Sequence, residues 1–253
     1  MNGFVTSRIY KFFNGTNWIT CAWATALFLP VIIGLSLLFI DYIEFIERAA
    51  TYLPISSITL IFIIWGCVNL PLVLLGSWYG FKFSPIEVPV KVSRIPRETP
   101  TNLPFYTWKS VTVTAGGFAC FACASSEVYF LITSIWREQY YFMYFFLGIA
   151  LIMTFVSAAL VSILQTYALL NNGNFHWWWR SFWIGAATGA YLWLACWLTY
   201  SFKHSEDNDG LNVFIYHICS LNICLCIALM CGMVSFYASF RFVRKIYSEA
   251  KDE

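Results

Sequence analysis

The sequence is poor in charge. Only 11% of its 253 residues are Asp, Glu, Lys or Arg, whereas soluble domains carry about 25%. Hydrophobic residues make up 60% of the chain and aromatic residues 20%. A soluble domain of this length could not bury so much apolar surface and still present a wettable exterior. The composition therefore excludes a soluble enzyme and a disordered chain. The net charge of +2 excludes a nucleic-acid binder, and a polytopic membrane protein is the prediction that remains.

Motifs of common catalytic and metal sites are also missing. The sequence has no Gly-rich phosphate loop, HExxH pair or Ser-His-Asp set, so no known reaction is indicated. All nine cysteines fall inside predicted spans, where a thiol acts as a small apolar packing residue. Cys120 and Cys123 share one helix face by their spacing, but a metal site needs more ligands than this pair. We expect no enzyme activity, metal or cofactor.

Long apolar runs are abundant, and six of them are long enough to cross a bilayer. A transmembrane helix needs about 20 mainly apolar residues. The runs lack the two-residue alternation of barrel strands, so we predict an all-α fold, a bundle of six transmembrane helices within residues 18–240. The predicted spans are residues 18–40, 58–79, 111–135, 141–164, 182–202 and 213–240.

Lys and Arg residues fall mainly on one side of this predicted bundle. Twelve of the fifteen lie in four segments, and three lie in the loops of the opposite side. Because cytosolic loops carry the excess of Lys and Arg, we expect both termini in the cytosol. The four expected cytosolic segments are an N-terminal segment (1–17), a Pro-rich loop (80–110), a Trp-rich loop (165–181) and a tail (241–253).

A few polar residues lie inside the predicted spans. Glu127 is the one carboxylate there, and a carboxylate at bilayer depth is costly and usually faces the bundle interior or a wet cavity. An ion or proton site is one interpretation, and a protonated Glu127 bonded to a neighbouring helix is the other. Asn69 precedes Pro71, whose missing donor can break a helix along a transport path or can serve packing alone. Asn222 is expected to bond to another helix.

Two glycine pairs and one aromatic cluster complete the candidate sites. Gly76 with Gly80, and Gly185 with Gly189, have the four-residue spacing that lets helix backbones approach closely. Three tryptophans in a row predict an interfacial anchor, with rings at the headgroup level and a cation that reaches phosphates. The anchor residues are His176, Trp177, Trp178, Trp179 and Arg180.

The loop over residues 82–104 is equally unusual, because five prolines are interleaved with basic residues. This density of proline favours a stiff extended segment across the cytosolic face.

Taken with the chain ends, these segments resemble the nonaspanins, the transmembrane nine superfamily of endomembrane proteins. The matching residues lie in order at 8–12, 80–82, 85–91, 176–182 and 242–247. The resemblance covers the family's C-terminal part, so this chain would supply the last six of nine spans without the large lumenal domain. It departs from the family at residues 171–174, where asparagines and a glycine replace acids, and at 157–160, where the family tends to have a carboxylate.

The resemblance also implies a function. Lys251 and Glu253 look like the family's terminal Lys-x-Asp/Glu signal, which implies binding to a vesicle coat and retention in the Golgi. The implied role is a non-enzymatic protein of Golgi and endosomal membranes that sorts or localises client membrane proteins. Glycine faces such as Gly185 and Gly189 would then be docking sites for client helices. The alternative is a transporter or channel for ions or small solutes that uses Glu127.

Overall fold

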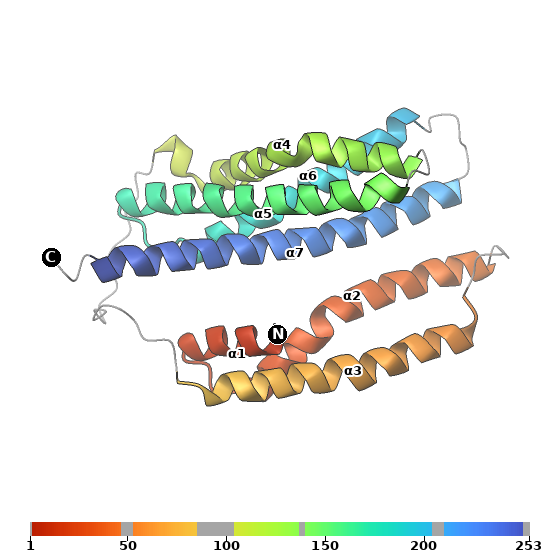
Figure 1. Ribbon diagram of the computed structural model, residues 1–253, viewed down its shortest axis with the longest axis horizontal. Helices are drawn as coiled ribbons and strands as arrows, with labels where there is room; N and C mark the ends of the chain where they lie inside the picture. Colours follow the sequence, from red (N-terminus) through yellow and green to blue (C-terminus); the bar gives the residue numbers. More distant parts are fainter. Residues whose placement is uncertain (1, 47–52, 85–103, 137–139, 204–209, 250–253) are drawn as a thin grey trace. The chain divides into compact units, whose positions relative to one another are not determined.

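The computed structural model describes residues 2–46, 53–84, 104–136, 140–203 and 210–249, and these are almost entirely helical. The chain divides into two compact units, Met1–Val88 and Pro89–Glu253. Unit 1 contains α1 (Asn2–Phe12), α2 (Trp18–Ile46) and α3 (Ile55–Lys82). Unit 2 contains the 3₁₀ turn η1 (Phe105–Thr107), α4 (Lys109–Trp136), α5 (Tyr140–Asn171), α6 (Trp178–Lys203) and α7 (Gly210–Glu249) (Figure 1).

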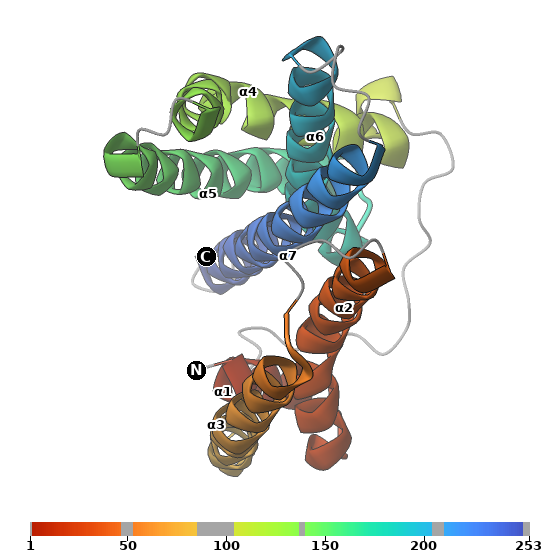
Figure 2. The ribbon, with the colours of Figure 1, turned by 90° about the vertical axis from the view of Figure 1, so that its right-hand side faces the viewer.

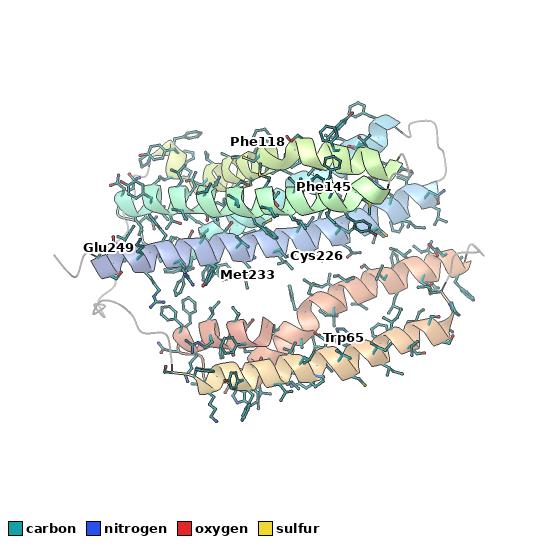
Figure 3. The ribbon with its side chains drawn as sticks, in the orientation of Figure 1. Trp65, Phe118, Phe145, Cys226, Met233 and Glu249 are labelled. Carbon is teal, nitrogen blue, oxygen red and sulfur yellow. The ribbon has the colours of Figure 1, made fainter. Side chains whose placement is uncertain are left out.

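Five described helices are long and apolar enough to cross a membrane: α2, α3, α6, α7 and the Met143–Asn171 part of α5. Large apolar side chains on the helix surfaces suit a lipid environment, as for Phe118 of α4, Phe145 of α5 and Met233 of α7, all more than half exposed (Figure 3). The predicted all-α fold class is confirmed. A sixth span at α4, which has 28 residues, stays a prediction.

The helices are longer than the apolar runs that predict them. α5 continues to Asn171 and α6 starts at Trp178, so most of the expected Trp-rich loop 165–181 is helical. α7 likewise extends to Glu249, well into the expected tail. Hydropathy identifies the part of a helix that lies in the hydrocarbon core of the bilayer. The backbone hydrogen bonds of the helix continue into the membrane interface, until a capping signal ends the helix. These expected loops are therefore helical in part, and their place in the cytosol stays a prediction.

In unit 1, α1 lies directly against the C-terminal half of α3. A Cβ atom on Gly76 would lie 3.3 Å from the backbone nitrogen of Phe4, and one on Gly80 would lie 2.7 Å from the carbonyl oxygen of Phe4. Gly3 makes the same kind of approach from α1 to the carbonyl of Val73. The Gly76 and Gly80 face is therefore occupied by α1, which lies in the segment expected as a cytosolic N-terminus.

Lys11 closes the end of α3. Its Nζ donates to the carbonyl oxygens of Phe81 at 2.8 Å and Phe83 at 2.7 Å, and Arg8 lies 5.5 Å from the centre of the Phe83 ring. The last carbonyls of a helix have no partner within it and carry the negative end of its dipole. The basic segment at residues 8–12 therefore has a structural role, which is to fix α1 to α3.

Replacing Lys11 with methionine should weaken this attachment by about 1–2 kcal/mol, because the apolar stem remains and the charged donor is lost. The expected result is faster amide hydrogen exchange across α1 in the full chain. Lys82→Met is the matched control, since the Lys82 Nζ lies over the ring of Trp78, 5.6 Å from its centre, and not at the carbonyls that Lys11 caps. Equal acceleration in both variants would contradict the capping role.

In unit 2, α4 packs along α5 and α6 along α7 (Figure 2). Cys120 of α4, Ala158 of α5 and Cys231 of α7 form a fully buried cluster at the centre. Such small side chains allow helix backbones to approach closely. Cys123 is exposed although Cys120 is buried, so the expected cysteine pair does not face the core together.

Hydroxyl groups join α5 to α7 inside this unit. Ser162 donates to the carbonyl of Ser235 at 3.1 Å, and the Ser235 hydroxyl donates to the carbonyl of Ala158 at 3.2 Å. One turn further along, Thr166 donates to the hydroxyl of Ser239 at 2.9 Å. These buried polar groups thus satisfy one another across the interface.

Candidate functional site

The turn between α5 and α6 is built by a helix-ending motif. Gly173 has φ +74°, and its N–H donates to the carbonyl of Leu170 at 2.9 Å, while Asn174 donates to Leu169 at 3.2 Å. This pair of bonds is the Schellman arrangement that terminates helices at a left-handed residue. The Asn174 side chain then accepts from the backbone N–H of His176 at 3.0 Å. Residues 171–174 therefore set the entry of the Trp-rich segment into α6.

The three tryptophans do not share one environment. Trp177 faces inward and stacks on Phe236 of α7, with 6.0 Å between ring centres. Trp178 is partly buried and meets Trp177 edge-on. Trp179 is 64% exposed, as an interfacial anchor requires. His176 is exposed and lies 4.2 Å from the ring centre of Phe175. The expected anchor function thus fits Trp179 best, whereas Trp177 contributes to packing.

Arg180 joins α6 to the start of α4. Its Nη1 donates to the carbonyl oxygen of Thr107 at 2.6 Å. Thr107 is 1% exposed, and its hydroxyl donates to the carbonyl of Pro104 at 2.7 Å. A charged donor at this distance makes one of the stronger hydrogen bonds available to a protein. Arg180 was expected to reach lipid phosphates, and the structure gives it a partner within the protein.

A small polar cavity lies beside this contact, between η1 and helices α4, α5 and α6. Its volume is about 10 Å³, which is room for roughly one water molecule. The described residues around it offer hydroxyl, amide and guanidinium groups and include no carboxylate, imidazole or thiol. We therefore assign it to structural hydration and not to chemistry. Its polar lining consists of Thr107, Thr112, Gln165, Thr166, Arg180 and Ser181.

The polar residues expected inside the spans are distributed over both units. Asn69 is partly buried in unit 1, where α3 continues through Pro71 without an interruption. Asn222 is partly buried on α7 in unit 2. Glu127 lies on α4, but its side chain is outside the described residues, as are Lys251, Glu253 and loop residues 85–103. Over the described part of the chain, no group of three or more His, Cys, Asp or Glu side chains could hold a metal ion.

The glycine pair of α6 lies against α7. A Cβ on Gly185 would overlap the carbonyl oxygen of Cys231, and one on Gly189 would lie 2.6 Å from the carbonyl oxygen of Cys224. Both glycines are buried. This face is therefore covered by the protein's own helix, and a client helix could reach it only by displacing α7.

Comparison with known families decides what kind of protein carries these features. Residues 1–208 match the family model described as Endomembrane protein 70. The chain belongs to the Endomembrane protein 70 family. The resemblance to nonaspanins is confirmed, because relatives named as Transmembrane 9 superfamily members match along 98% of the chain. The protein is accordingly an integral membrane protein of an endomembrane family.

Relatives in this family come from animals and plants. Transmembrane 9 superfamily member 2 of Rattus norvegicus and that of Homo sapiens are each 31% identical over 249 residues, which is 98% of this chain and 37% of the relative. Transmembrane 9 superfamily member 9 of Arabidopsis thaliana is 28% identical over 98% of this chain and 38% of the relative. The chain thus spans little more than a third of these family members. No solved structure matches the chain.

Several residues of the candidate site carried no signal in the sequence. Thr107 receives the Arg180 bond through its backbone carbonyl, which any residue type provides. Phe236 is one of many aromatic residues in an apolar run, and nothing in its spacing marks it as the partner of Trp177. Gly173 could have been found, since glycine after a helical run predicts a helix end. The Trp-rich segment at residues 176–182 thus joins elements that are distant in the chain.

Proposed function

We propose that the protein sorts or localises other membrane proteins in Golgi and endosomal membranes, without catalysing a reaction. The observation that carries this proposal is the match to Endomembrane protein 70 along residues 1–208. The packing of unit 2 supports it, because the interior hydroxyl groups pair across α5 and α7 and the polar cavity has room for roughly one water. Such an interior favours a function exercised at the helix surfaces.

Client proteins would meet the outward aromatic faces of α4 and α5 and not the glycine pairs. Tyr129 of α4, with Tyr144 and Phe145 of α5, are each at least 65% exposed. Flat aromatic side chains give a transmembrane partner a large contact area with few rotamers to fix. The transporter alternative loses the argument from a broken helix, since α3 passes Pro71 as a continuous helix.

The terminal signal gives the sharpest test of localisation. Replacing Lys251 and Glu253 together with serine should lower the steady-state fraction of the fluorescent protein in the Golgi several-fold. The coat binding that returns the wild-type protein to the Golgi would be lost in this variant. The matched control replaces Lys245 and Glu249 with serine. This pair lies 3.8 Å apart on the exposed end of α7 and carries the same charges. Unchanged localisation of the Lys251/Glu253 variant, or an equal shift in both variants, would contradict the retention role.

Sorting needs a separate measurement. Depletion of the protein should redistribute a set of membrane proteins between Golgi and cell surface, as measured by surface biotinylation and mass spectrometry, and the wild-type chain should restore them. Restoration by the mislocalised tail variant as well would show that sorting does not depend on Golgi retention. An unchanged surface composition after depletion would overturn the sorting proposal.

A further inference from the structure

Unit 1 contains an apolar cavity between α2 and α3. Its volume is about 460 Å³, and its lining residues fall within 29–41 of α2 and within 53–65, the stretch that begins α3. α1 packs against the other half of α3, where Gly76 and Gly80 lie against Phe4, so the cavity lies along the half that α1 does not cover. Small-molecule sites are clefts of roughly 300–1,000 Å³, mostly apolar with a few polar groups. The cavity has the size and character of such a site.

The cavity follows the two helices over about the depth of one membrane leaflet. The stretch of α2 from Leu29 to Asp41, which both line the cavity, measures about 18 Å at the rise of an α-helix. The hydrocarbon core of a bilayer is about 30 Å thick, so one leaflet contributes about 15 Å. α2 and α3 are both candidate spans, and Asp41 lies near the end of α2 at Ile46. Asp41 is therefore expected at the level of the membrane surface, with the rest of the cavity in the lipid phase.

Asp41 makes one end of the cavity polar. Among the described residues that line the cavity, it carries the one charge. Its Oδ1 accepts from the backbone N–H of Leu53 at 2.6 Å, which ties the end of α2 to the start of α3. A carboxylate offers about four acceptor sites, so Asp41 can accept a further hydrogen bond from a ligand. Glu44 lies one turn further along α2 on the same face. Two carboxylates at this end favour a neutral hydroxyl group and repel a phosphate.

The walls of the cavity favour a rigid body made of rings. Leu35 of α2, with Ile61 and Phe62 of α3, line the cavity and are each at least 45% exposed, so a ligand would cover them. Trp65 of α3 lines it as well (Figure 3). A dry cavity of about 150 Å³ holds one benzene ring, so a cavity of about 460 Å³ has room for several fused rings. A rigid ligand also loses less conformational freedom in a preformed cavity than a flexible acyl chain does.

We propose that this cavity binds a sterol. The fused rings lie between α2 and α3, and the sterol hydroxyl donates a hydrogen bond to a carboxylate oxygen of Asp41. A phospholipid fits less well, because its phosphate would lie beside Asp41 and Glu44 at the membrane surface. The bound sterol would join α2 to α3 along the half of the unit that α1 does not cover. Sterol binding is separate from the proposed sorting role, so a failure of one leaves the other standing.

The experiment uses the full chain in nanodiscs of phosphatidylcholine. The probe is a cholesterol analogue that carries a photoreactive diazirine on its ring system, and the labelled peptides are mapped by mass spectrometry. The expected result is labelling concentrated in residues 29–41 and 53–65, which excess cholesterol reduces several-fold. Cholesterol methyl ether has no hydroxyl to donate. It should need a roughly ten-fold higher concentration to compete equally, as the loss of one hydrogen bond to a charged group predicts.

Two glycine substitutions test where the sterol binds. Gly34 lines the cavity, and a Cβ there would lie 3.7 Å from the ring of Phe62. Gly34→Leu should therefore fill part of the cavity and lower the labelling several-fold. Gly66→Leu is the matched control, because it adds the same side chain to α3 at a position where a Cβ meets nothing within 4 Å and which does not line the cavity. This variant should be labelled as the wild-type chain is.

Four results would overturn the proposal. The first is the absence of labelling from both stretches of the wild-type chain, a measurement that does not depend on how any variant folds. The second is equal labelling of Gly34→Leu and Gly66→Leu, and the third is equal competition by cholesterol and its methyl ether. The fourth is stronger labelling of the same stretches by a photoreactive phosphatidylcholine or ceramide, which would assign the cavity to a lipid with acyl chains.

Discussion

Replacing Gly185 with alanine should lower the free energy of unfolding of unit 2 by about 1–3 kcal/mol, although alanine is the better helix former by roughly 1 kcal/mol. The added Cβ would overlap the carbonyl oxygen of Cys231 and the hydroxyl of Ser235. Because Ser235 donates to the carbonyl of Ala158, moving it also breaks a bond between α5 and α7. One methyl group would thus disturb both interfaces that involve α7.

The measurement is equilibrium unfolding of the full chain in mixed micelles, followed by tryptophan fluorescence. Gly148→Ala is the matched control, since a Cβ at Gly148 of α5 meets nothing within 4 Å. This control should be neutral or slightly stabilising, as helix propensity alone dictates. A Gly185→Ala variant as stable as Gly148→Ala would show that α6 and α7 can separate without cost.

Removal of the Arg180 side chain should release the start of α4. The Arg180→Ala variant leaves the buried carbonyl of Thr107 without the donor that lies 2.6 Å away, and an unsatisfied buried acceptor costs about 1–3 kcal/mol. Amide hydrogen exchange in η1 and the first turn of α4 should become roughly ten-fold faster or more, since 1.4 kcal/mol corresponds to a factor of ten. Arg180→Lys should restore part of the protection, because lysine keeps the charge but not the fixed fork of donors.

Arg241→Ala is the control for this experiment. The Nε of Arg241 donates to the Tyr237 hydroxyl on the same helix at 2.9 Å, and both residues are exposed. Its removal should leave exchange in η1 unchanged. If Arg180→Ala also leaves η1 protected, the contact to Thr107 does not hold this turn in place.

The fold was largely predictable because the bilayer imposes a strong rule on composition. An apolar run of about 20 residues must satisfy its backbone internally, and a helix does so. Runs such as 18–40 and 58–79 accordingly fall inside α2 and α3. The helix ends were less predictable, since they depend on local capping. Gly173 ends α5, whereas the hydropathy of the run falls well before it.

The candidate site was predictable in its residue types but not in its partners. Three consecutive tryptophans indicate a position at the membrane interface, but nothing in the sequence distinguishes one from another. In the structure Trp177 faces inward and Trp179 faces outward. The glycine spacing predicted close helix approach without naming the helix, and α7 supplies it for Gly185. Contacts between distant segments depend on three-dimensional packing, which periodicity within one helix does not encode.

The hydroxyl pairs between α5 and α7 have a mechanical consequence. Ser162 with Ser235, and Thr166 with Ser239, keep one constant offset along the two helices. Sliding one helix past the other by less than a turn, about 5.4 Å, would break these bonds between the two helices. The two helices therefore hold discrete positions relative to each other and move as one unit. Any motion of this unit in the membrane is expected to rotate or tilt α5 and α7 together.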